Sequence, residues 1–322
     1  MTLERVRVGI CSWADAALIE DGSFYPKKSM SPEARLRWYA RFFDTVEVNS
    51  PYYAIPDVRH TERWCERTPP GFVFNVKAYA LLTGHHPKAE SLPADVVALL
   101  PAQPARTPRG EIDRASVPAD AVDAAFRLFR AALDPLARAR KLGYVLFQFA
   151  PWVHFGDEWL AYIAALPSRL PGFTVAAEFR HRSWFPEHGV ETLEALRSAG
   201  VAHVVVDGPV LGGSVPRVTT ATAPASILRL HGRNAEGWSR QLRGESPAVR
   251  EKYDYRYTDA ELRELVPEVA MLADESEQVF VSFNNNNRAY PVQNALVMRR
   301  LLGHRVETPP AMAAPATGDL FR

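Results

Sequence analysis

Eight short runs rich in valine, isoleucine and phenylalanine recur along the chain, and most are followed by a turn and a helical pattern. This repeat is typical of parallel β/α units, whose strands are buried on both faces. Eight such units in 322 residues favour the α/β class and a single TIM-type (β/α)8 barrel over an open doubly wound sheet. The predicted strands are Arg5–Ser12, Thr45–Tyr52, Phe72–Tyr79, Tyr144–Ala150, Thr174–Arg180, Ala202–Asp207, Ser226–His231 and Gln278–Asn284.

Several predicted helices have recognisable ends. Ser31-Pro32-Glu33 supplies an N-cap, a first-position proline and an early acid ahead of an apolar helical pattern. Thr258 and Glu261 have the spacing of a capping box. Glycines that would suit a left-handed helix end follow three further helical patterns, at Gly143, Gly200 and Gly303.

Three stretches depart from the ideal barrel. His85–Pro118, after the third strand, is too long for a plain loop and is predicted to be a lid-like or partly disordered insertion. Gly208–Ala225 is rich in glycine, proline and threonine, so we expect the sixth helix to be missing. Thr308–Arg322 is rich in proline and alanine and is predicted to be a flexible tail. Residues 1–307 would then form one barrel domain.

Charge and composition exclude several classes of partner. Thirty-eight Lys and Arg residues against 37 Asp and Glu residues give a net charge of +1, so we expect no binding to nucleic acid or to an anionic membrane. No apolar run is long enough to cross a bilayer, and the first residues lead at once into a strand pattern, which leaves no room for a signal peptide. With only two cysteines as well, the sequence predicts a cytoplasmic protein.

Alternation along the strands predicts which polar side chains enter the barrel. The outward face must be apolar because helices cover it, so the valines of the second strand send Glu47 and Asn49 inward. The same rule sends Asn75 and Lys77 of the third strand inward. These groups concentrate at the carboxyl ends of the strands, where barrel enzymes build their sites. The remaining inward polar residues predicted in this way are Gln148, Glu178, Arg180, His203, Asp207, Arg229, His231, Ser282 and Asn284.

These side chains suggest acid and base chemistry on a polar or anionic molecule. Glu178, Glu47 and Asp207 are candidate carboxylates for proton transfer or nucleophilic attack, and Lys77 completes the candidate catalytic set. Arginines that bind through two nitrogens favour a phosphate, a carboxylate or a sugar derivative. The alternative is a structural network in which the same charges only pair with one another. The candidate substrate-binding residues are Arg180, Arg229, His231, Asn49, Asn284, Gln148, Trp13 and Tyr25.

A divalent metal ion is the main alternative to metal-independent chemistry. Glu178, Asp207, His231 and Glu47 are the side chains that would bind it. Several neighbouring basic side chains would repel a dication, so we predict no cofactor.

Several motifs over nearly the whole chain carry a family resemblance. They are Gly9-Ile10-Cys11-Ser12-Trp13, Phe24-Tyr25-Pro26, Thr45-Val46-Glu47-Val48-Asn49-Ser50-Pro51-Tyr52-Tyr53, Phe74-Asn75-Val76-Lys77, Glu178-Phe179-Arg180-His181-Arg182-Ser183-Trp184, Arg229-Leu230-His231-Gly232-Arg233, Tyr255-Arg256-Tyr257 and Phe283-Asn284-Asn285. On these motifs the chain resembles the YecE-like family, also called the domain of unknown function 72 family. The resemblance implies a TIM-type barrel but no particular reaction. It implies a polar mouth built around Glu47, Lys77, Glu178, Arg180, Arg229, His231 and Asn284.

Three functions are consistent with the sequence. The leading hypothesis is a metal-independent enzyme of the hydrolase or lyase type that acts on a sugar, a sugar phosphate or a similar molecule, with Glu178 as general acid and base. The second is a divalent-metal barrel enzyme of the isomerase or phosphodiesterase type. The third is a binding or adaptor protein, because the terminal Leu320-Phe321 resembles the short peptide that docks into bacterial DNA sliding clamps.

Overall fold

Eight parallel strands form the barrel, pairing in the order β1-β8-β7-β6-β5-β4-β3-β2. A parallel bridge between Cys11 and Glu47 brings β2 back beside β1. The computed structural model describes residues 4–212, 214–242 and 249–312. This architecture confirms the predicted TIM-type barrel. The strands are β1 Val6–Ile10, β2 Thr45–Val48, β3 Val73–Lys77, β4 Leu142–Gln148, β5 Val175–Glu178, β6 Ala202–Asp207, β7 Ala225–Leu230 and β8 Gln278–Phe283.

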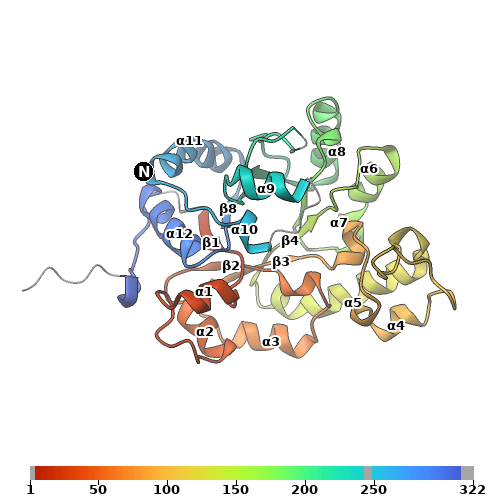
Figure 1. Cartoon of the computed structure of the whole chain (residues 1–322), viewed down its shortest axis with the longest axis horizontal. Coiled ribbons are helices and arrows are strands. Elements are labelled where there is room, and N and C mark those ends of the chain that lie inside the picture. The colour runs from red at the N-terminus through yellow and green to blue at the C-terminus, as the bar shows by residue number, and fades with distance from the viewer. Residues whose placement is uncertain (1–3, 213, 243–248, 313–322) are drawn as a thin grey trace, which may run out of the picture.

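Helices surround the strands, and α9 and α10 cross in front of them in the view of Figure 1. The longest, α5 and α11, each contain an internal proline. The helices are α1 Ala16–Asp21, α2 Pro32–Tyr39, α3 Val58–Glu66, α4 Ala94–Val97, α5 Ala119–Arg138, α6 Asp157–Ala164, α7 Leu166–Arg169, α8 Gly189–Ala199, α9 Ala235–Leu242, α10 Val249–Lys252, α11 Asp259–Glu275 and α12 Tyr290–Leu301.

Two apolar layers hold the barrel together. The larger lies between the strands and the helices and includes Val46, Phe74 and Val205. The smaller fills the barrel interior with residues such as Tyr144 and Val204. The polar side chains of the candidate site lie toward the strands' carboxyl ends, whereas Asn75 is buried deeper in the interior, where its Nδ2 donates to Thr45 Oγ1 at 3.0 Å.

The helix ends confirm most of the predicted signals. Ser31 caps α2, and Thr258 with Glu261 forms a complete capping box on α11. Gly200 has a φ of +69° directly after α8, and Gly303 has a φ of +80° after α12. Gly143 is the exception, because it lies inside β4. A Cβ there would come within 2.1 Å of Asn75 Oδ1, so close packing inside the barrel requires this glycine.

The predicted departures from the ideal barrel are partly confirmed. No helix occurs between β6 and β7 in residues 208–212 and 214–224, as expected. The insertion His85–Pro118 is ordered rather than partly disordered: it contains α4 and packs against α5, beside the barrel rather than over its centre (Figure 1). Within the predicted tail, Pro310–Met312 forms a 3-10 turn with Met312 packed on the core, and residues 313–322 lie outside the described residues. Leu320 and Phe321 lie outside the described residues.

No helix in the described part of the chain is long and apolar enough to cross a membrane.

Candidate active site at the carboxyl mouth of the barrel

Arg229, at the end of β7, is the centre of a buried charge network. Its Nε donates to Glu47 Oε2 at 2.9 Å and its Nη2 donates to Glu47 Oε1 at 2.6 Å, which makes a two-pronged pair. Its Nη1 donates to Glu178 Oε2 and also to Gln148 Oε1, the latter at 3.3 Å. Both carboxylates are fully buried. Because a guanidinium stays protonated, it fixes these two acids across the barrel from β2 to β5.

Two further side chains hold Glu178. Arg180 Nε lies 3.0 Å from Glu178 Oε1, and His231 Nε2 lies 3.4 Å from the same oxygen. Asn284 Nδ2 lies 2.8 Å from His231 Nδ1 and fixes the imidazole ring. These contacts orient the imidazole so that its Nε2 faces the carboxylate. The structure therefore brings seven predicted site residues into one network: Glu47, Gln148, Glu178, Arg180, Arg229, His231 and Asn284.

Tyr144 belongs to the same network, although the sequence analysis missed it. Its hydroxyl donates to Glu47 Oε2 at 3.0 Å and lies 3.3 Å from Ser282 Oγ. A tyrosine in an apolar strand looks like core, and only the inward placement of Gln148, four residues further along the same strand, could have indicated its position. Cys11 Sγ lies 3.9 Å from Arg229 Nη2, and burial raises the pKa of this thiol, so Cys11 is a packed thiol rather than a nucleophile.

Lys77 lies beside this network without a partner of its own. Its Nζ is 4.2 Å from the centre of the Tyr52 ring, and no hydrogen bond or ion pair reaches it from the described residues. Lys77 is partly exposed at the end of β3. Burial and the positive charge of Arg229 lower the pKa of Lys77 from 10.5 to about 7. The amine is therefore poised to gain or lose a proton near neutral pH.

Glu178 and His231 each keep one protonation state near pH 7. Burial alone would raise the pKa of Glu178, but the charges of Arg229 and Arg180 outweigh it and hold this pKa well below its usual range. Burial and the charge of Arg180 lower the pKa of His231 to about 3. Glu178 is therefore ionised and His231 neutral, which makes Glu178 an unsuitable general acid.

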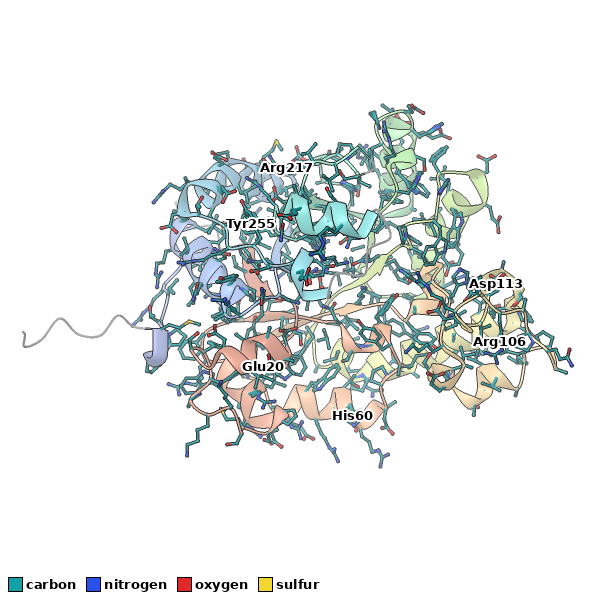
Figure 2. All side chains as sticks on the ribbon, in the orientation of Figure 1. Glu20, His60, Arg106, Asp113, Arg217 and Tyr255 are labelled. Atoms are coloured by element: carbon teal, nitrogen blue, oxygen red, sulfur yellow. The ribbon has the colours of Figure 1, made fainter. Side chains whose placement is uncertain are left out.

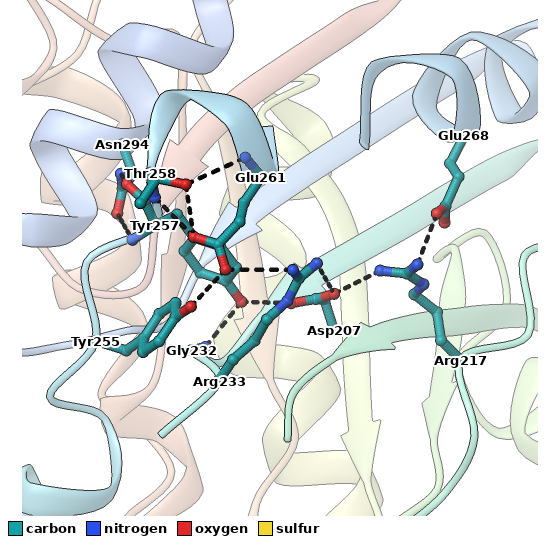
Figure 3. A network of polar contacts seen from close by, with 10 residues as sticks. All are labelled: Asp207, Arg217, Gly232, Arg233, Tyr255, Tyr257, Thr258, Glu261, Glu268 and Asn294. Carbon is teal, nitrogen blue, oxygen red and sulfur yellow. Dashed lines mark hydrogen bonds and ion pairs between the residues drawn. The ribbon is translucent and has the colours of Figure 1, made fainter. Parts of the chain in front are cut away.

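Asp207 lies in a different network, so the prediction that it points into the barrel is wrong. Arg233 Nε and Nη2 donate to its two oxygens at 2.9 and 2.8 Å, and Arg217 Nη1 donates to Oδ2 at 2.6 Å. The Tyr257 hydroxyl also donates to Asp207, at 2.7 Å (Figure 3). Burial would raise the pKa of Asp207, but hydrogen bonds from Arg233 and Tyr257 lower it. Asp207 is therefore a fixed anion that anchors loops.

The error arose because the apolar face of the sixth strand, which carries Ala202 and Val204, lines the barrel interior, so the polar face points outward. Val204 belongs to the inner apolar layer, whereas Val205 packs against the helices, and His203 and Asp207 share the outward side with Val205. His203 accordingly contacts the 208–224 loop, with Nε2 3.1 Å from the Val218 carbonyl oxygen. Alternation separates the two faces of a strand, but the rule that the apolar face points outward fails here, where no helix of the described residues 208–212 and 214–224 covers the outside.

Three other candidates lie apart from the charge network. Asn49 follows β2, and its Oδ1 is buried without a hydrogen-bond partner in the described chain. Trp13 packs edge-on against Trp64 and Phe74 in the outer apolar layer. Tyr25 is buried and donates its hydroxyl hydrogen bond to the Trp13 carbonyl. Trp13 and Tyr25 therefore support the packing behind the first loop.

The described residues contain no group of three or more His, Cys, Asp and Glu side chains arranged to hold a metal ion. Of the four residues proposed as ligands, Glu47 and Glu178 share Arg229 and Asp207 is bound by other arginines.

An aromatic segment between β7 and α11 covers part of the mouth. Arg180 Cζ lies 5.5 Å from the centre of the Trp238 ring on α9, and Lys252 of α10 lies over the same ring at 5.0 Å. The rings of Trp238 and Tyr253 both lie near His231, with their centres 6.4 and 6.2 Å, respectively, from the centre of the imidazole. Arg233, Tyr255 and Tyr257, which belong to the network around Asp207, fix the two ends of this segment (Figure 3).

The fold and the charged mouth define a TIM-type barrel protein with a polar site at its carboxyl face. The chain belongs to the family described as protein of unknown function DUF72, whose model matches residues 7–318. It is 35% identical over 301 residues to the UPF0759 protein YunF of Bacillus subtilis strain 168, covering 92% of this chain and 94% of that protein.

Solved structures of the same family share the fold. A DUF72 family protein from Enterococcus faecalis V583 matches with a TM-score of 0.76 and 24% identity, covering 94% of this chain and 97% of that one. A second, from Thermotoga maritima MSB8, matches with a TM-score of 0.69 and 27% identity, covering 94% of this chain and all of that one (100%).

Proposed function

We propose that this protein is an enzyme that binds a small anionic molecule at the mouth and moves protons with Lys77. The observation that carries the proposal is the position of Lys77. It is a partly exposed amine without an ion pair or hydrogen bond from the described residues, beside a network that fixes every other charge around it.

The charge balance of the mouth supports an anionic ligand. Arg180, Arg229 and protonated Lys77 supply three positive charges against the two carboxylates of Glu47 and Glu178. An anion such as a phosphate or a carboxylate would neutralise the remaining charge. Arg180 has 15% of its side chain exposed and can contact such a group, whereas the Arg229 side chain is 1% exposed and holds the carboxylates.

The role of general acid and base fits Lys77 better than Glu178. A group transfers protons most effectively when its pKa is near the working pH, and the pKa of Lys77 is lowered to about 7. Glu178 remains ionised, and its negative charge opposes that shift and positions Arg180. Chemistry of the hydrolase or lyase type on a sugar phosphate or a related hydroxy acid would use both an anion site and a basic amine.

Binding and turnover of the full-length chain test this proposal. Calorimetric titration with inorganic phosphate and with glucose 6-phosphate should show binding that Lys77→Ala and Arg180→Ala weaken by about tenfold or more. Arg217→Ala is the matched control, because it removes an arginine of the network around Asp207. Lys77→Arg should retain binding and lose turnover, because arginine keeps the charge but does not deprotonate.

Turnover is followed by proton NMR in deuterium oxide, which reports exchange at carbon, and by release of phosphate. The proposal is wrong if the wild-type chain binds neither anion, or if Lys77→Ala and Lys77→Arg leave binding and turnover unchanged.

A further inference from the structure

A continuous row of aromatic rings runs outward from Lys77. Tyr52, under the amine, contacts His85 with ring centres 5.1 Å apart, and His85 contacts Trp152 at 5.7 Å. Trp152 then stacks on His86 at 5.1 Å with an interplanar angle of 17°. The row thus connects the mouth to the loops that follow β3 and β4, which is the face where barrel proteins bind their ligands.

The row ends in a hollow of about 410 Å³. This volume is within the range of about 300–1,000 Å³ that is usual for small-molecule sites. One wall comes from the 85–118 insertion and the other from the loop after β4 and from α6. Figure 2 places Asp113 of this insertion at the periphery of the molecule. The lining residues are Gly84, His86, Asp113, Arg114, Ala115, Trp152, Glu158, Trp159 and Tyr162.

Trp152 is exposed but fixed in place. Half of its surface, 51%, is open to solvent, although its indole Nε1 donates to the Gly84 carbonyl at 3.0 Å. His86 covers one face by stacking, and His85 meets the ring edge-on. A large apolar ring that is held rigid and left open loses little entropy when a ligand stacks on it.

Charged side chains surround this ring. Asp113 lies 3.5 Å from His86 and accepts from the Ala115 N–H, so its carboxylate is oriented at the rim. Arg114 is held by its Nε, which donates to the Leu81 carbonyl at 2.8 Å. Glu158 is exposed on the first turn of α6. Carboxylates accept hydrogen bonds from hydroxyl groups, and a guanidinium donates them.

From this arrangement we infer that the hollow is a carbohydrate subsite, in which a sugar ring stacks on Trp152 and its hydroxyl groups bind Asp113, Glu158 and Arg114. The negative face of the indole attracts the weakly positive C–H face of a sugar ring. The carboxylates at the rim favour a neutral sugar here over a second anion. This inference rests on the proposed function and narrows it: the substrate is a glycoside or sugar derivative whose anionic part lies at Lys77 and Arg180.

Saturation-transfer NMR on the full chain tests the subsite with neutral disaccharides. The probes are cellobiose, maltose and N,N′-diacetylchitobiose, which have no charge for the Lys77 site to bind. At least one should bind the wild-type chain, and Trp152→Ala should weaken that binding by about tenfold or more, whereas Trp152→Phe should retain most of it. Val190→Ala, at an exposed apolar position on α8, is the matched control.

Asp113→Asn serves as a second variant because it keeps the stacking ring and alters only the rim. It should weaken disaccharide binding severalfold, and melting curves establish that each variant is folded. Lys77→Ala should leave disaccharide binding unchanged, so failure of the proton-transfer proposal and failure of the subsite give different results. The inference is overturned if none of the three disaccharides binds the wild-type chain, or if Trp152→Ala binds them equally well.

Discussion

Two arginine–carboxylate networks lie at the carboxyl end of this barrel, and they differ in what they leave available. The network around Arg229 is inside the barrel, joins β2, β5 and β7, and lies beside Lys77, whose amine has no hydrogen bond or ion pair among the described residues. The network around Asp207 lies outside the barrel interior, and each of its two arginines binds a second carboxylate. Arg217 also binds Glu268, and Arg233 also binds Glu261 (Figure 3).

We interpret the network around Arg229 as the candidate site and the network around Asp207 as a structural support for the loops. In the outer network two arginines meet three carboxylates, and its contacts fix the ends of the segment that carries Trp238. In the inner network the positive charges exceed the carboxylates by one when Lys77 is protonated. Buried charge of one sign is costly to maintain, and this excess is the basis of our proposal that the mouth binds an anion.

Removal of Arg229 should have the largest effect on stability. Arg229→Ala leaves Glu47 and Glu178 buried without their main partner, which should lower the free energy of unfolding at pH 7 by about 3–5 kcal/mol. Arg217→Ala, whose side chain is 37% exposed, should lower it by no more than about 1 kcal/mol. Urea unfolding of both variants measures the contrast. Equal losses would mean that the two networks are energetically alike.

Lys77 should make stability depend on pH in a direction opposite to that of an ordinary paired lysine. Its folded pKa of about 7 lies below the unfolded value near 10.5, so between these values the unfolded chain binds more protons. Wild-type stability should therefore rise from pH 7 toward pH 10 relative to Lys77→Met, by at most about 1.4 kcal/mol per pH unit. A difference that stays constant over this range would show that the lysine has an ordinary pKa.

Loss of one hydroxyl in the outer network should have a smaller effect. Tyr257→Phe removes the donor to Asp207 and the acceptor of the Gly232 N–H, which should cost about 1–2 kcal/mol of unfolding free energy. Phosphate binding at the mouth should be retained, because Lys77 and Arg180 are untouched. If Tyr257→Phe abolishes phosphate binding while the chain remains folded, the outer network is part of the site.

The sequence was informative where one face of a strand is polar. The valines of β2 placed Glu47 correctly inside the barrel, and the same alternation placed Lys77 and Arg229. It failed in β6, where the apolar face lines the barrel interior and Asp207 was assigned to the wrong side. Local patterns do not encode contacts between distant strands.

Two further features depend on such distant contacts. Gly143 looked like a helix end, but it is required by Asn75 of the neighbouring strand. The row of rings from Tyr52 to Trp152 joins residues about a hundred positions apart, and single aromatic residues gave no sign that they would meet. Both features therefore arise from packing that only the closed barrel creates.

Direct titration of the Lys77 amine tests the account most sharply. The lysines of the full chain are reductively methylated with ¹³C, and the Lys77 signal is assigned by its absence in Lys77→Arg. Its chemical shift is then followed from pH 5 to pH 11. A midpoint near pH 7, well below the value near 10.5 of an exposed lysine, is the result this account predicts. A midpoint near 10.5 would contradict it, because the amine would then remain protonated and could not act as the base of the site.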